Sequence, residues 1–152
     1  MVIRFNKETI NNFNIENFSN LVGKVGLYFI YLNDLLIPYP LRCSRLIYIG
    51  MSESRINSIG NRLKDHLSGR SRNRGIIGYK QNWQLSFTCL EYEFLKHIFI
   101  EEKIEYIETY FLEDFASKHG TYPICNNKRG LEEIPKITNT PKIDWNFFGK
   151  IK

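Results

Sequence analysis

Two short segments decide the fold, Gly26-Leu27-Tyr28 and Tyr48-Ile49-Gly50. Each lies in a run of aromatic and β-branched residues, which predicts strands over residues 25–32 and 46–50. Each also brings a tyrosine close to a glycine, so that a hydroxyl group lies where another backbone or a ligand can approach. By themselves, two strands that carry tyrosine are more often core packing than chemistry. The other parts of a reactive site therefore have to be found elsewhere in the chain.

The composition indicates one folded domain with a modest excess of positive charge. The chain has 152 residues, of which 43% are apolar and 14% aromatic, as is typical of a globular domain rather than a disordered chain. Lysine and arginine outnumber aspartate and glutamate by 21 to 16, which gives a formal net charge of +5. This excess favours a polyanionic partner such as nucleic acid, although many basic proteins bind none.

Cysteine usage and hydropathy predict a soluble, cytoplasmic protein. The three cysteines are odd in number and far apart, which argues against a disulfide framework or a zinc ribbon: Cys43, Cys89 and Cys125. The first ten residues carry charges where a signal peptide needs an apolar run. The longest apolar stretch, residues 25–41, is interrupted by polar residues and prolines, so it is not expected to span a membrane.

We expect an α/β fold of the α+β kind, with a small central antiparallel sheet of about three strands flanked by helices. The two tyrosine strands would form a hairpin whose connection carries an insertion at about residues 33–44. Residues 83–94 alternate in part between apolar and polar side chains, which predicts the third strand. Residues 1–22 are expected to form an N-terminal arm or helix, residues 23–130 the main domain, and residues 131–152 a tail that packs on the domain or on a partner chain.

A helix is predicted over about residues 58–67, because apolar residues recur there at every fourth position, Ile59, Leu63 and Leu67. Ser58 is a suitable N-cap and Gly69 a suitable C-terminal stop. Arg62 and His66 are also four residues apart, so they share one stripe of this helix beside its apolar face. On an arbitrary helix such a pair is most often a solvated arginine and an edge histidine.

A basic loop is predicted over residues 69–75, where three arginines occur without an apolar residue to anchor them: Arg70, Arg72 and Arg74. Lys80 follows shortly afterwards. These side chains are either a solvated surface or contacts for nucleic-acid phosphates, whose binding would depend on salt. The residue pattern leaves both readings open.

A longer helix is predicted over about residues 99–118, ending at Gly120. Its apolar positions follow helical spacing: Ile100, Ile104, Ile107, Phe111 and Phe115. Most of the glutamates between them must form a solvated face, but one of them can face a site. Asn126 follows just beyond the helix.

Taken in order, these features resemble the GIY-YIG endonuclease superfamily. After the two tyrosine segments come an R-x-x-x-H helix at Arg62 and His66, and Glu108 followed by the apolar pair Phe111-Leu112. Asn126 comes last. The resemblance spans about residues 26–126. The chain departs from the family in its longer connection between the strands and in Met51, where many members have lysine.

The resemblance implies a GIY-YIG-like catalytic domain over residues 23–130 that hydrolyses DNA phosphodiester bonds with a metal ion. Two-metal nucleases gather several carboxylates, and the sequence shows no such cluster. A single Mg²⁺ or Mn²⁺, held by Glu108 and mostly by water, is therefore the expected cofactor. Glu105 lies on the same helix, but only Glu108 has the apolar pair at the right offset.

The resemblance also implies roles for the other site residues. Tyr28 would position or deprotonate the attacking water, with Tyr48 completing its hydrogen-bond network. Arg62 would contact the scissile phosphate, since its planar fork fits two oxygens. His66 would relay a proton or bind phosphate, and Asn126 would brace the site.

The expected partner is DNA, with Arg70, Arg72, Arg74 and Lys80 as its phosphate contacts. A homodimer or a partner protein would supply sequence specificity. The alternative is a nucleic-acid-binding module of the same fold that has lost its catalytic activity. A plasmid-nicking assay with and without EDTA separates the two.

Overall fold

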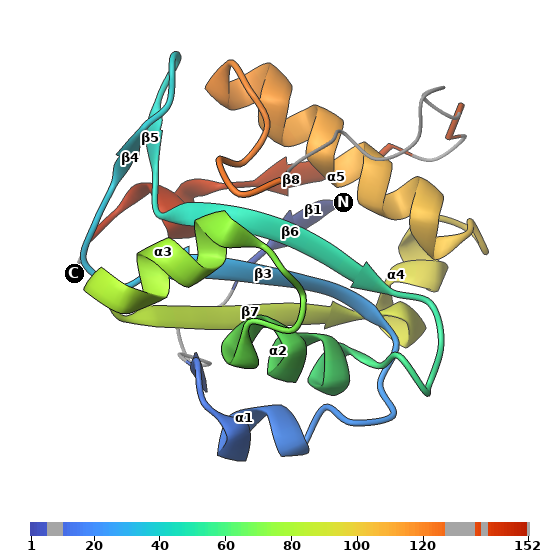
Figure 1. Ribbon diagram of the computed structural model, residues 1–152. Coiled ribbons are helices and arrows are strands. Elements are labelled where there is room, and N and C mark those ends of the chain that lie inside the picture. Colours follow the sequence, from blue (N-terminus) through green and yellow to red (C-terminus); the bar gives the residue numbers. More distant parts are fainter. Residues whose placement is uncertain (6–10, 127–135, 138–139, 152) are drawn as a thin grey trace.

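A four-stranded antiparallel sheet lies at the centre of the computed structural model, which describes residues 1–5, 11–126, 136–137 and 140–151. Its strand order is β2 (Asn11–Asn12), β7 (Leu85–Glu91), β3 (Gly26–Leu32) and β6 (Leu46–Ser52). The three long strands form its body, and the two residues of β2 extend one edge (Figure 1). The structure thus confirms a mixed α+β fold whose three-stranded antiparallel sheet is flanked by helices.

The strand that carries Tyr28 lies in the middle of the sheet. All seven residues of β3 are buried, because it pairs with β6 on one side and β7 on the other and is covered on both faces. Successive residues of a strand point to opposite faces. Tyr28 therefore contacts His66 on one face, whereas Phe29 packs against Phe111 on the other.

Three helices cover the face to which Tyr28 points: α1 (Ile15–Ser19), α2 (Ile59–Ser68) and α3 (Arg74–Asn82) (Figure 1). The ends of α2 agree with the sequence prediction. Ser58 caps it by accepting from the backbone N–H of Asn61, and Gly69 ends it in the left-handed conformation with φ 85°. None of the helices in the described ranges is long and apolar enough to cross a membrane.

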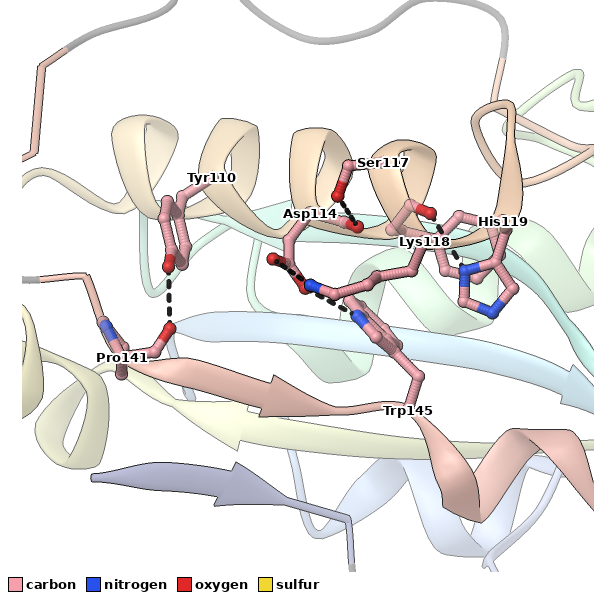
Figure 2. Close-up of polar contacts among 8 residues, drawn as sticks. Tyr110, Asp114, Ser117, Lys118, His119, Pro141 and Trp145 are labelled. Carbon is pink, nitrogen blue, oxygen red and sulfur yellow. Dashed lines mark hydrogen bonds and ion pairs between the residues drawn. The ribbon is translucent and has the colours of Figure 1, made fainter. Parts of the chain in front are cut away.

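The opposite face is covered by α5 (Ile104–His119) and by the two chain termini. The terminal strands β1 (Val2–Arg4) and β8 (Lys142–Asp144) pair in parallel, and the short 3-10 helix η1 (Asn146–Gly149) follows β8. Trp145 is buried there, and its indole N–H donates to Asp114 on α5 over 2.8 Å (Figure 2). The C-terminal segment therefore packs on the domain, while the predicted boundary between residues 130 and 131 lies outside the described residues.

Two predicted element boundaries were wrong. The third strand ends at Glu91, and the residues after it form α4 (Tyr92–Ile98). The long helix begins at Ile104 rather than Phe99, because Ile100 and Glu101 adopt φ values of 53° and 60°, which no α-helix contains. The apolar spacing alone could not show this left-handed break.

The predicted basic loop is shorter than expected. It ends at Asn73, and Arg74 and Gly75 belong to α3, a helix that the sequence reading missed. The Asn73 side chain caps α3 by accepting from the Ile76 N–H over 3.0 Å. The available signal in the sequence was Asn73 itself, because asparagine is a preferred N-cap residue. The insertion at residues 33–44 contains a small hairpin of β4 (Ile37–Pro38) and β5 (Cys43–Ser44).

Candidate active site

Tyr28 and Gly50 lie directly opposite each other on β3 and β6. The Tyr28 ring crosses over the glycine so closely that a Cβ atom on Gly50 would lie 2.2 Å from the Tyr28 Cζ atom. Any other residue at position 50 would displace the phenol. The Tyr48 ring lies beside it, with 6.0 Å between the two ring centroids. Gly50 therefore leaves the space that the Tyr28 ring occupies.

The tyrosines meet a buried histidine from α2. The Tyr28 hydroxyl lies 3.0 Å from His66 Nε2, and the Tyr48 ring meets the imidazole edge-on at 5.0 Å between centroids. The other ring nitrogen, Nδ1, lies 2.8 Å from Ser71 Oγ. His66 is 5% exposed, so it is buried and is not the edge histidine that an arbitrary helix would most often carry.

Two charged side chains act on this cluster from opposite sides. Arg62 is exposed on α2, one turn before His66, and its positive charge lowers the pKa of both Tyr28 and Tyr48. Glu108 is half-buried on α5, and its negative charge raises both pKa values. The fold therefore brings together a cation, a carboxylate, two phenols and an imidazole from four different elements.

Burial dominates the protonation of the two phenols. It is the main reason that the pKa of Tyr28 is well above its usual value of 10.0 and that the pKa of Tyr48 is raised. The nearby Tyr48 side chain raises the pKa of Tyr28 further. Both groups are consequently neutral phenols at neutral pH.

Burial, helped by the charge of Arg62, lowers the pKa of His66 to about 4 from 6.5. The imidazole is therefore neutral at neutral pH and has a nitrogen lone pair that can accept a proton.

Asn126 braces β6 at the position between Tyr48 and Gly50. Its side-chain oxygen accepts from the Ile49 N–H over 3.0 Å, and its amide donates to the Ile49 carbonyl over 2.9 Å. The free edge of β6 is thus closed at this point, which holds the tyrosine and the glycine in register.

The four residues predicted to contact phosphates have different surroundings. Arg70, Arg72 and Arg74 are exposed around the turn that joins α2 to α3. Lys80 is half-buried, and its ammonium group donates to the Leu67 carbonyl near the C-terminal end of α2. A lysine at that place satisfies a terminal carbonyl and complements the helix dipole. This contact gives Lys80 a structural role that the sequence reading did not foresee.

The residues present suit a metal ion with few protein ligands. Within the part of the chain that the structure describes, no three His, Cys, Asp or Glu side chains gather to hold a metal. Glu108 is the carboxylate whose charge reaches both phenols, which favours it over Glu105. A single carboxylate, with water as the remaining ligands, matches the coordination habits of Mg²⁺.

The low pKa of His66 predicts a pH-dependent stability. Between about pH 4 and pH 6.5 the unfolded chain binds a proton at His66 that the folded protein does not bind. The free energy of unfolding is therefore highest above this window and falls by about 3 kcal/mol as the pH is lowered through it. Denaturant unfolding at several pH values measures this slope.

Replacing His66 by glutamine should remove most of that slope. His119 is the matched control, since burial lowers its pKa as well and its own contribution would remain in the variant. An unchanged slope in His66→Gln would show that His66 titrates normally in the folded protein.

No protein-family model matches the chain, and no curated protein and no solved structure matches it either. The resemblance to a nuclease family therefore rests on the residues of this chain and stays a prediction.

Proposed function

We propose that the protein is a metal-dependent endonuclease of the GIY-YIG type that hydrolyses phosphodiester bonds in DNA. The observation that carries the proposal is the contact of the Tyr28 hydroxyl with His66 Nε2 at 3.0 Å, beside the exposed cation Arg62. Titratable groups with strongly shifted pKa values that lie within hydrogen-bond distance of each other are candidates for proton transfer.

The chain's own residues supply the proton path and the phosphate contact. The Tyr28 hydroxyl would take the proton of the attacking water while its own proton passes to the neutral His66. Because the phenol is fully buried in the structure, bound substrate must first open a path for water to it. Tyr48 lies beside Tyr28, with 6.0 Å between the ring centroids, and helps to hold the phenol in place. Arg62 binds the non-bridging oxygens, where a planar guanidinium can engage two of them at once.

Glu108 would hold the Mg²⁺ or Mn²⁺ ion, which, when bound, stabilises the negative charge on the phosphate and on the leaving oxygen. The carboxylate comes from α5 and the guanidinium of Arg62 from α2.

The three exposed arginines of the α2–α3 turn suit contacts to the DNA backbone: Arg70, Arg72 and Arg74. Each phosphate contact makes binding weaker as the salt concentration rises. Lys80 donates to the Leu67 carbonyl and has two further N–H donors, so its proposed contact with DNA stays a prediction.

A plasmid-nicking assay tests the proposed function. We expect relaxed or linear DNA with Mg²⁺, no product with EDTA, and a loss of about 10²-fold or more in Arg62→Ala. The control is Arg4→Ala, an exposed arginine at the chain terminus that pairs with Asp144. Salt-dependent DNA binding without any cleavage would instead identify the chain as a binding module that has lost its activity.

A further inference from the structure

Ser71 lies outside the residues that resemble a nuclease, yet it contacts the histidine of the site. Its hydroxyl oxygen is 2.8 Å from His66 Nδ1, while the Tyr28 hydroxyl is 3.0 Å from His66 Nε2. A neutral imidazole has one N–H donor and one acceptor nitrogen. Whatever bonds to one nitrogen therefore determines whether the other can accept a proton.

Backbone hydrogen bonds of the turn hold Ser71 next to His66 Nδ1. The Ser71 N–H donates to the Asp65 carbonyl over 3.1 Å, one residue before His66. The next residue, Arg72, has φ 61°, a left-handed conformation that is unfavourable for any residue with a side chain. Its N–H donates to the Gly69 carbonyl over 3.0 Å, which closes the turn. Strain of this kind persists where the surrounding structure requires it, often at functional sites.

The Ser71 hydroxyl has an acceptor position available for His66. Its oxygen receives the Asn73 N–H over 3.4 Å and retains a second lone pair. Because Ser71 is exposed, its own proton can be donated to water. The hydroxyl is therefore not obliged to donate to His66.

We propose that Ser71 is a positioning residue that accepts a hydrogen bond from His66 Nδ1–H and so keeps Nε2 as the acceptor for the Tyr28 hydroxyl. The catalytic part of this inference rests on the proposed function. Without Ser71, the Nε2–H tautomer would direct its proton at the Tyr28 oxygen, and the phenol would lose its base.

The proposed reaction needs an unprotonated Nε2 on His66. As the water oxygen bonds to phosphorus, its proton moves to the Tyr28 oxygen and the Tyr28 proton moves to His66 Nε2. The bond from phosphorus to the leaving oxygen breaks, and that oxygen takes a proton from solvent. His66 ends as an imidazolium whose Nδ1–H still donates to Ser71, and it returns to neutral by releasing the Nε2 proton to solvent.

Nitrogen-15 NMR of the histidine rings in the full chain at neutral pH tests the contact directly. His119 is an internal reference, because its Nδ1 lies 2.9 Å from the Phe115 carbonyl, which can only accept, so Nδ1 must carry the proton (Figure 2). We expect His66 to show the same Nδ1–H pattern in the wild-type protein. Ser71→Ala should convert His66 to the Nε2–H pattern, while Ser71→Thr, which keeps a hydroxyl, should not. The His119 signals should be unchanged in both variants, which verifies the fold.

Plasmid cleavage supplies the functional readout. Ser71→Ala should cut at least about tenfold more slowly at saturating DNA, part of the roughly 10²–10⁴ that positioned proton transfer contributes. DNA affinity should be unchanged, and Ser71→Thr should restore the rate. An Nε2–H pattern in the wild-type protein, or an unchanged pattern in Ser71→Ala, would overturn the inference. If the wild-type protein cuts no DNA, the proposed function fails, whereas the ring-nitrogen pattern still decides whether Ser71 sets the tautomer.

Discussion

Replacing Glu108 by glutamine should reduce Mg²⁺-dependent DNA cleavage by about 10³-fold, because the amide keeps the shape of the side chain but cannot neutralise a cation. Glu108 is half-buried on α5, and its charge reaches both active-site phenols. Because the described residues contain no cluster of three metal-ligating side chains, we expect none of them to compensate for its loss. The rate is measured by plasmid nicking over a series of Mg²⁺ concentrations.

The matched control for this substitution is Glu105→Gln. Glu105 is half-buried on the same helix, one turn before Glu108, and carries the same charge. We expect it to cleave at close to the wild-type rate. If a folded Glu108→Gln variant cleaves DNA at the wild-type rate, Glu108 is not the metal ligand. If cleavage is lost in Glu105→Gln alone, Glu105 is the metal ligand instead.

The second large effect is expected for Tyr28→Phe, which should lose about 10²–10⁴-fold in cleavage rate. The substitution removes the one atom that contacts His66 Nε2 and leaves the ring in its place over Gly50. DNA binding should be unaffected, because the proposed phosphate contacts are Arg62 and the exposed arginines of the α2–α3 turn rather than the phenol. Single-turnover cleavage at saturating DNA separates the loss in rate from any loss in binding.

Tyr31→Phe is the control for the loss of a buried tyrosine hydroxyl. Tyr31 lies on the same strand, but its ring packs against Phe147 and Phe148 on the opposite face of the sheet. It should cleave within about twofold of wild type, in line with a substitution away from the reacting groups.

Tyr28→Phe leaves His66 Nε2 without its partner, which costs about 1–3 kcal/mol of stability. Both variants are therefore compared at a temperature where circular dichroism shows them folded. If Tyr28→Phe cuts as fast as Tyr31→Phe, the phenol takes no part in the reaction.

The proposed reaction also depends on which imidazole nitrogen carries the proton. Tyr28 and His66 can lie at the right distance and still be inactive if the imidazole holds its proton on the wrong nitrogen. Ser71 lies in the segment between α2 and α3, residues 69–73, which includes the left-handed Arg72. A chain with the same six site residues but without a hydroxyl under the imidazole should cleave more slowly.

Local patterns in the sequence were sufficient for the elements that carry most of the site. The aromatic and β-branched runs predicted β3 and β6, and the fourfold spacing with a serine cap and a glycine stop predicted α2. Such patterns predict helices and strands correctly because hydrogen bonding and capping within an element depend on residues only a few positions apart. They mislocate the end of an element where the backbone changes conformation within an apolar run, as at Ile100 and Glu101 before α5.

The sequence by itself determined which side chains were candidates, since only residues of the right chemical type can serve: two phenols, an arginine, a histidine, a glutamate and an asparagine. Only the tertiary structure decided how they meet. Gly50 makes room for Tyr28 because the two residues pair across strands, and Asn126 closes the edge of β6 from 77 positions away. Contacts between distant residues depend on strand register and on the path of the turns, which no local pattern encodes. For that reason no local pattern showed that Lys80 donates to the Leu67 carbonyl or that the Ser71 hydroxyl contacts His66 Nδ1.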